Sequence, residues 1–554
     1  MIGQFAALAL LMTVSCFGPG FLVVRRFRWD PVETFTASVG LSLLILYLMA
    51  FSAFWAGLPA WANLATTVGC VMATAVTFKD ARRLFRSARL RSCLRSFGWL
   101  TLWTIGAQLL IRHYSGGEAC CDWVEHYQRS MNFVRPKPDD FLYIGRSLLT
   151  ARPPFMNVVC AHFLAQVGTD FALYQVVFSV LNLTVFFPCA LIARLIARRG
   201  LSSFGLLAAM LAANPMFFEN TTFAWTKALT ATYVLLGLWF YLVGLRRRDP
   251  LRLGAAFTSL AAGCLVHFSA GPYALFLGLH YLVTVWRLPR PVRTLGATVA
   301  PALLVLATWF TWAVIRYGVR ATFLSNSTVA DTSTLGLADN LEKIAGNIWD
   351  SIQPHLFNGL NGLPPNGPFR LLIDRAFMLY QVNLPLAVGS VGCLVVGWLL
   401  VRGLGSGGRL RGGERLFWWL FIPFQIIVGI AAHGERIHSG LAHIGLQPLV
   451  YAAVALLAAA APTLPARIRV ALGAGVLVDF FLGVVLELYM EHSMDQWAWS
   501  PNWDWKANEG LIYLGDRALI FALPTALAMC AGASFAFMLL VRSLRPRPQT
   551  TSAP

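Results

Sequence analysis

The sequence predicts an all-α fold, a polytopic bundle of about 15 transmembrane helices. Three observations predict it. Of the 554 residues, 57% are hydrophobic and only 12% are charged, which is about half the charged fraction of a soluble protein. Apolar stretches long enough to cross a bilayer recur along the chain, and basic residues gather in the connections between them. This composition excludes a large soluble enzyme and a disordered chain.

The expected spans follow one another closely, apart from a few long connections. They run near 2–24, 32–57, 60–78, 97–112, 171–196, 201–217, 226–245, 251–269, 271–286, 294–314, 382–402, 416–432, 441–461, 467–490 and 517–541. The first lacks a basic leading region and a small-residue cleavage site, so we expect a span and not a signal peptide. Residues 1–544 form one predicted transmembrane domain, and 545–554 are expected to be a disordered cytoplasmic tail.

Clusters of arginine and lysine set the expected orientation. They occur at 25–28, 79–95, 194–199, 246–252, 287–293, 402–415, 467–469 and 542–547. All of them fall on one side if the chain alternates through the predicted spans. Cytoplasmic loops carry an excess of Lys and Arg, so we expect the N-terminus outside and the C-terminus in the cytoplasm. The net charge of +19 is therefore a topology signal, and no nucleic-acid partner is expected.

Four connections are expected on the outer face, near 113–170, 317–383, 433–443 and 491–516. We expect helical segments within them. Residues 335–349, for example, have amphipathic spacing and are expected to lie along the outer leaflet. Chemistry is expected in these connections, because polar loops are positioned there by a rigid helical scaffold.

The densest polar group in the first outer connection is Asp122, Glu125 and His126. Their spacing of i, i+3 and i+4 places them on one face of a helix. Two carboxylates and an imidazole can hold a general base near neutral pKa or bind a divalent cation. The alternative is a helix cap, with Asp122 as N-cap and Glu125 completing a capping box.

Three further motifs follow at intervals: Arg-Pro-Pro at 152–154, the stretch 214–227 (NPMFFENTTFAWTK), and 267–273 (HFSAGPY). Together with the Asp122 group, this series resembles the GT-C superfamily of integral-membrane glycosyltransferases. The closest branch is the bacterial one related to protein mannosyltransferases and lipid A aminoarabinose transferases. The resemblance covers roughly residues 100–290. It implies transfer of a sugar from a polyprenyl-phosphate donor to an acceptor hydroxyl on the outer face, with Asp122 as the catalytic base and Glu125 and His126 beside it.

A lipid-phosphate donor would need cations to stabilise the leaving phosphate. It would also explain why no phosphate-binding glycine loop is found. The candidates for this role are Arg152, Lys227, His267 and Arg436. The alternatives are snorkelling for Lys227 at a span end, a membrane-surface position for Arg152, and a packed structural role for His267.

The connection 433–443 contains three histidines, an acid and an arginine. A metal site is the alternative interpretation of this connection. Its spacing matches no H-E-x-x-H motif, so the metal itself stays unknown. We expect Arg436 to contact the donor phosphate and His438 and His443 to line the same cavity. Trp503, in the Trp-rich segment 497–505, could stack on a sugar, and an interfacial aromatic belt is the alternative.

Two other functions remain open on the sequence. One is a transporter or flippase of lipid-linked sugars, although such proteins bind substrate near mid-membrane. The other is an O-antigen ligase or polymerase, in which the 433–443 histidines would be catalytic. The expected partners are a polyprenyl-phosphate sugar, a lipid, glycan or protein acceptor, and membrane lipids. No cofactor is expected with certainty, and a divalent cation is the alternative that stays open. The expected location is the bacterial inner membrane.

Overall fold

The computed structural model is a bundle of helices, and the residues that it describes contain no β-strand. Eight helical segments among them are long and apolar enough to cross a membrane. The predicted all-α transmembrane fold is therefore confirmed for this part of the chain. The described residues are 2–59, 61–112, 114, 122–145, 147–196, 203–323, 336–353, 379–404, 412–431, 445–488 and 511–517.

The eight long apolar segments are spread over the chain. They comprise α1 with α2 (Ile2–Ser15, Gly18–Val24), α3 (Pro31–Trp55), α8 with α9 (Phe171–Leu183, Phe186–Ile196), α12 (Lys227–Arg247), α14 (Gly271–Thr284), α15 (Pro291–Phe323), α20 (Gly412–Ala431) and α22 (Ala466–Asp479). Shorter apolar helices are α7 (Phe155–Val167), α13 (Pro250–Val266), α19 (Ser390–Leu404) and α21 (Gln447–Ala460). The remaining named α-helices are α4 (Ala62–Phe85), α5 (Ala88–Gln108), α6 (Asp122–Val134), α10 (Phe204–Ala212), α11 (Pro215–Thr222), α16 (Leu337–Ile352) and α18 (Leu384–Val388).

Besides 2–24 and 171–196, two further predicted spans are divided between two helices. The single span expected near 201–217 is wrong, because α10 ends before Asn214 and α11 begins at Pro215. The Asn214 side chain accepts a hydrogen bond from the backbone of Phe217 at 2.9 Å, which starts the second helix. The span expected at 382–402 is divided at Gly389, whose φ of 116° a residue with a Cβ rarely adopts.

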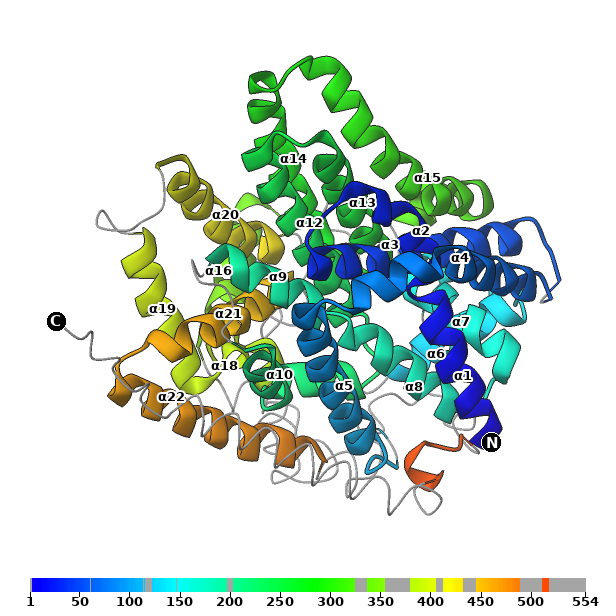
Figure 1. Ribbon diagram of the computed structural model, residues 1–554, viewed down its shortest axis with the longest axis horizontal. Helices are drawn as coiled ribbons and strands as arrows, with labels where there is room; N and C mark the ends of the chain where they lie inside the picture. Colours follow the sequence, from blue (N-terminus) through cyan, green and yellow to red (C-terminus); the bar gives the residue numbers. More distant parts are fainter. Residues whose placement is uncertain are drawn as a thin grey trace.

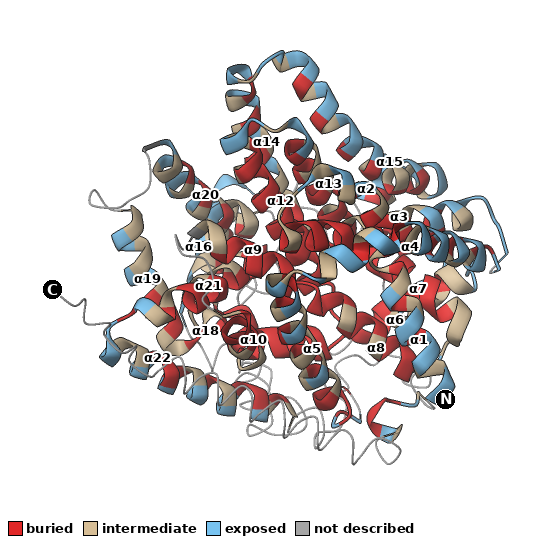
Figure 2. Cartoon of the chain, viewed as in Figure 1, coloured by how far each residue is buried: buried red, intermediate tan, exposed pale blue. Residues whose placement is uncertain are grey.

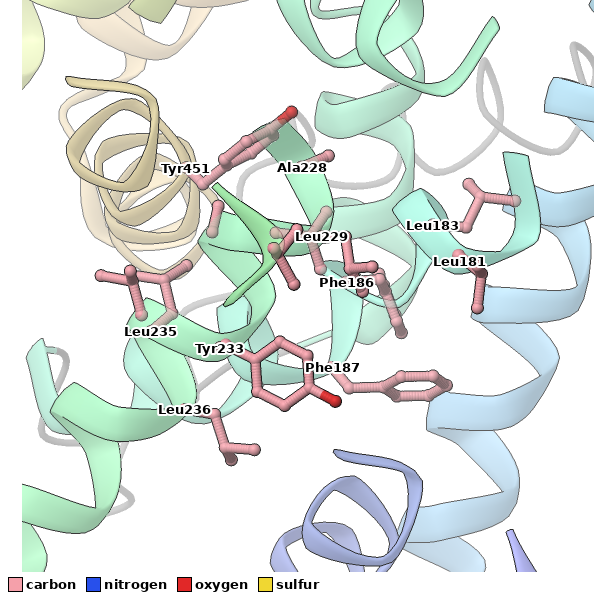
Figure 3. Close-up of a cluster of buried hydrophobic side chains, with 14 of the residues drawn as sticks. Leu181, Leu183, Phe186, Phe187, Ala228, Leu229, Tyr233, Leu235, Leu236 and Tyr451 are labelled. Carbon is pink, nitrogen blue, oxygen red and sulfur yellow. The ribbon is translucent and has the colours of Figure 1, made fainter. Parts of the chain in front are cut away.

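The core of the bundle is built around α12, which is buried on all sides along most of its length (Figures 1 and 2). An apolar helix without a polar face belongs in the interior. Tyr233 donates a hydrogen bond to the carbonyl of Gly40 in α3 at 2.9 Å. Around it, Leu229, Leu236 and Phe187 contribute to a dense apolar cluster (Figure 3).

The helices give the molecule two chemically different ends. α12 starts at Lys227 and reaches Arg247, which is about 30 Å further along for a helix of this length. α13 returns from Pro250, so that His267 comes back to the end of the bundle that holds Lys227. The candidate site residues Lys227 and His267 therefore lie at one end of the bundle, and the basic residues around 246–252 lie at the other end.

The described part of the first outer connection contains α6 and the buried apolar helix α7, which pack together. In the second outer connection, the predicted amphipathic helix is confirmed as α16. Its polar side chains are buried and its apolar side chains are exposed, the reverse of a helix on the surface of a soluble protein. Lys343, Asn347 and Asp350 are buried, whereas Leu341 and Trp349 are 58% and 61% exposed. An exposed apolar face of this kind suits a lipid environment. The expected span 517–541 and the expected tail 545–554 lie outside the described residues.

Candidate functional site

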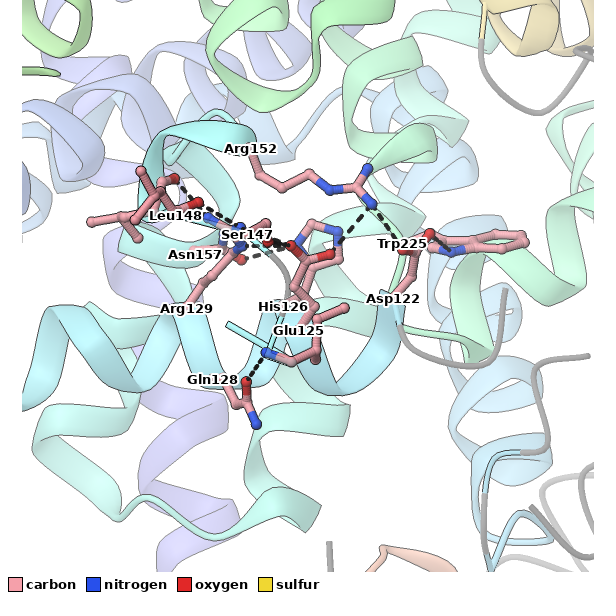
Figure 4. Close-up of polar contacts among 12 residues, drawn as sticks. Asp122, Glu125, His126, Gln128, Arg129, Ser147, Leu148, Arg152, Asn157 and Trp225 are labelled. Atoms are coloured by element: carbon pink, nitrogen blue, oxygen red, sulfur yellow. Dashed lines mark hydrogen bonds and ion pairs between the residues drawn. The ribbon is translucent and has the colours of Figure 1, made fainter. Parts of the chain in front are cut away.

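The site is centred on Asp122, the first residue of α6 (Figure 4). Its Oδ1 accepts a hydrogen bond from Arg152 Nη2 at 2.8 Å, and its Oδ2 accepts one from Trp225 Nε1 at 2.9 Å. These partners lie 30 and 103 residues further along the chain. The structure thus brings together three of the motifs quoted from the sequence. Both oxygens of the Asp122 carboxylate accept hydrogen bonds from residues that are distant in the chain.

Glu125 is one helical turn below Asp122 and almost fully buried. Its Oε1 accepts bonds from Arg129 Nη2 at 2.7 Å and from Ser147 Oγ at 2.8 Å, and its Oε2 lies 3.3 Å from Arg152. Burial raises the pKa of this carboxyl, but the cations Arg152 and Arg129 outweigh that effect and hold the pKa well below its usual range. Glu125 is therefore a fixed anion that cannot readily accept a proton.

Arg129 is fully buried and was not singled out from the sequence. Besides Glu125, its guanidinium donates to the carbonyls of Leu148 and Leu149 at 2.9 and 2.6 Å, and it lies 4.7 Å from the ring centroid of Tyr143. It thus fixes the chain just before Arg152. A basic residue four positions after Glu125 is the signal that could have revealed this pair.

His126 is the third member of the sequence group, and it faces α7. Its Nδ1 lies 3.3 Å from Asn157 Oδ1. Burial, with the neighbouring Arg152 cation, lowers the pKa of His126 to about 4. The imidazole is therefore neutral at physiological pH, and the structure places it as a packed hydrogen-bonding residue beside Glu125.

Lys227 completes the polar group from the start of α12. It is buried, and its Nζ lies 3.8 Å from the centroid of the Trp225 ring. Trp225 therefore uses its N–H for Asp122 and its aromatic face for Lys227. Because the ammonium is turned inward, the structure contradicts simple snorkelling. Buried Glu219 of α11 interacts electrostatically with Lys227 and is a second neighbour that sequence reasoning missed.

His267 lies just beyond the end of α13. Its Nδ1 accepts a hydrogen bond from the Ser269 backbone at 3.1 Å. Burial and the nearby cations Arg152 and Lys227 lower the pKa of His267 well below its usual value. It is thus a neutral residue within the electrostatic range of the site, and its Nδ1 is used for local structure.

The described residues do not suit a divalent cation as they are arranged. In the described part of the chain, no group of three or more His, Cys, Asp or Glu side chains is arranged so that it could hold a metal ion. Arg152 contacts both Asp122 and Glu125 and so occupies the position that a bridging cation would take. The other predicted site residues, Arg436, His438, His443 and Trp503, lie outside the described residues.

Comparison with known proteins finds similarity to solved structures only. No family model matches the chain, and no curated protein matches it. Two solved structures are similar to it. ArnT from Cupriavidus metallidurans bound to undecaprenyl phosphate is 16% identical with a TM-score of 0.41, over 80% of this chain and 74% of that one. ArnT from the same organism in the apo state is 14% identical with a TM-score of 0.35, over 73% and 78% of the two chains.

Proposed function

We propose that the chain is a membrane glycosyltransferase. It would transfer a sugar from a polyprenyl-phosphate donor to an acceptor hydroxyl at the outer face of a bacterial inner membrane. The observation that carries the proposal is the arrangement of Asp122, Arg152 and Lys227. It puts a partly exposed carboxylate beside two cations at one end of an apolar bundle. The sequence resemblance to the GT-C superfamily points to the same chemistry.

Of the two carboxylates, Asp122 is the better candidate for the general base. Its side chain keeps 22% of its surface exposed, against 3% for Glu125. Asp122 would take the proton of the acceptor hydroxyl while the hydroxyl oxygen attacks the anomeric carbon of the donor. Glu125 and His126 are then positioning residues beside it.

The bond between the anomeric carbon and the phosphate oxygen breaks in the same step, and its electron pair leaves with the polyprenyl phosphate. Arg152 and Lys227 would stabilise the negative charge that develops there, as preorganised cations do. An entering phosphate would also compete with Asp122 for Arg152, and so release a carboxylate oxygen for the acceptor. Neutral His267 would border this phosphate position, and Arg436, His438, His443 and Trp503 are proposed to complete the cavity.

The test is a transfer assay on the purified full-length protein. It uses a panel of radiolabelled sugars linked to undecaprenyl phosphate, the lipid bound in the similar ArnT structure, with envelope lipids as acceptors. We expect Asp122→Asn to lower kcat by about 100- to 10,000-fold, the usual contribution of a general base. The matched control is Asp139→Asn, an exposed aspartate whose partner is Arg316 at 2.7 Å. It should keep wild-type activity.

Three results would contradict the proposal. Transfer that survives in Asp122→Asn would remove the base assignment. Loss of transfer in His438→Ala, with Asp122→Asn unaffected, would favour the ligase or polymerase alternative. Movement of lipid-linked sugar across vesicles without any transfer product would favour the transporter alternative.

A further inference from the structure

A basic helical hairpin lies at the end of the bundle opposite the candidate site. It comprises residues 79–95, the last turns of α4 and the first turns of α5 (Figure 1). The sequence placed this cluster in a connection between spans, but the structure makes it helical except around the turn at Arg86 and Ser87. Seven of its residues are basic and one is acidic.

Part of this charge is used to hold the hairpin in place. Asp80 pairs with Arg25 and Arg83, and Arg89 pairs with Asp30 at 3.6 Å. The other basic residues are exposed, and in the described part of the chain no carboxylate pairs with them. They are Lys79, Arg82, Arg86, Arg91 and Arg95.

A cavity of about 650 Å³, open to the surface, lies on α5 in the hairpin. Among the described residues its walls are Ala88, Arg91, Leu94 and Arg95, whose spacing places them on one side of the helix. Arg91 and Arg95 are one helical turn apart, about 6 Å along the axis, so both can face one bound group. The cavity combines cations for an anionic group with apolar atoms for a chain attached to it.

The other helix of the hairpin has an exposed apolar face. α4 exposes Val71, Met72 and Val76 by 50–68% just before Lys79. The opposite end of α5 lies near the candidate site, where Gln108 donates a hydrogen bond to Tyr114 at 2.6 Å. Arg91 and Gln108 are 17 residues apart on α5, which is about 25 Å along the helix, so the cavity does not belong to the catalytic machinery.

We propose that this cavity and the basic hairpin form a binding site for an anionic phospholipid headgroup. Basic clusters next to membrane spans attract anionic lipids, and arginine binds phosphate through two parallel hydrogen bonds. The general preference for basic residues on one face explains the sign of the charge, but not a cavity with two arginines and an apolar wall. The acyl chains would lie against the exposed apolar face of α4.

The test is native mass spectrometry of the full-length protein in a neutral detergent, titrated with phosphatidylglycerol or phosphatidylcholine. We expect phosphatidylglycerol to bind more tightly than phosphatidylcholine. The double variant R91Q/R95Q should weaken phosphatidylglycerol binding by about 25-fold, since each cation near an anionic surface contributes roughly fivefold. The matched control is R287Q/R293Q. It removes the same charge from exposed positions in another connection of the same sign and should leave the binding unchanged.

Equal losses in the two double variants would overturn the proposal, because they would indicate a diffuse charge effect. Displacement of the lipid by inorganic phosphate at the same headgroup concentration would overturn the lipid assignment. A second measurement needs no variant. Raising the salt to about 0.5 M should weaken the binding to the wild-type protein, and binding that is insensitive to salt would contradict the proposal.

Discussion

Arg129 connects the buried part of the candidate site to its exposed part. It donates to Glu125 and to the carbonyls of Leu148 and Leu149, directly before Arg152. The spacing of Asp122, Glu125 and His126 correctly predicted that they share a helix. It could not predict their partners, because Arg152 and Trp225 reach Asp122 only through folding of distant segments.

At this scale we expect Arg129→Gln to be strongly destabilising. Breaking a buried ion pair costs about 3–5 kcal/mol, because the remaining charge loses its partner. Thermal unfolding in detergent should show a large decrease in Tm. Arg316→Gln breaks the exposed pair with Asp139 and should cost less than about 1 kcal/mol. Similar shifts in the two variants would show that the Arg129 network does not stabilise the fold.

Among the helices, the contact between α11 and the π-helical continuation of α22 positions the segment that carries Trp225. After Asp479, α22 continues as a π-helix over Phe480–Val484. Beyond it, buried Glu487 accepts a hydrogen bond from Thr222 at 2.7 Å. Asp479 itself accepts one from the backbone of Ser390 at 2.9 Å and so supports the start of α19. These two acids within a membrane span therefore have structural partners.

Gly483 lies at this helix contact. A Cβ there would come within 2.1 Å of Pro215 Cγ. We expect Gly483→Ala to cost about 1–3 kcal/mol through overpacking and to lower transfer activity by shifting α11. The control is Gly397→Ala in α19, where no atom lies within 4 Å of an added Cβ. It should be neutral or slightly stabilising, because alanine favours a helix over glycine. Equal Tm values for the two variants would contradict the packing argument.

The break between α10 and α11 has a local signal that the hydropathy pattern hides. Asn-Pro at 214–215 is a typical helix start, with an N-cap followed by proline in the first turn. The apolar residues on both sides made the segment look like one span. The amphipathic helix α16 was predictable from its spacing. The burial of its polar face depends on what surrounds it, which the spacing alone does not encode.

Across the whole molecule, the two chemically different ends determine how the protein sits in its membrane. The ends of α12 and α13 place Lys227 and His267 on one side and the basic residues around 246–252 on the other. The same division was predicted from the alternation of basic clusters, and the described helices agree with it. The orientation in the cell, with the site outside, stays a prediction.

We expect cysteines introduced at opposite ends to react from opposite sides of the membrane. An impermeant thiol reagent should label Asp140→Cys in intact spheroplasts and Arg247→Cys only after permeabilisation, because basic residues favour the cytoplasm. Both positions are exposed, and the unmodified protein gives the background labelling of its native cysteines. The reverse pattern would place the candidate site in the cytoplasm and contradict the orientation.

The sequence by itself determined that the chain is a helical membrane protein, which side of it is basic, and which helix carries the candidate acids. These properties depend on composition and on spacing within one segment. Only the tertiary structure decided that Asp122 is shared between Arg152 and Trp225, that Glu125 is fixed by Arg129, and that Lys227 points inward. The physical reason is that burial and charge pairing depend on segments that are distant in the chain and become neighbours only when the bundle packs.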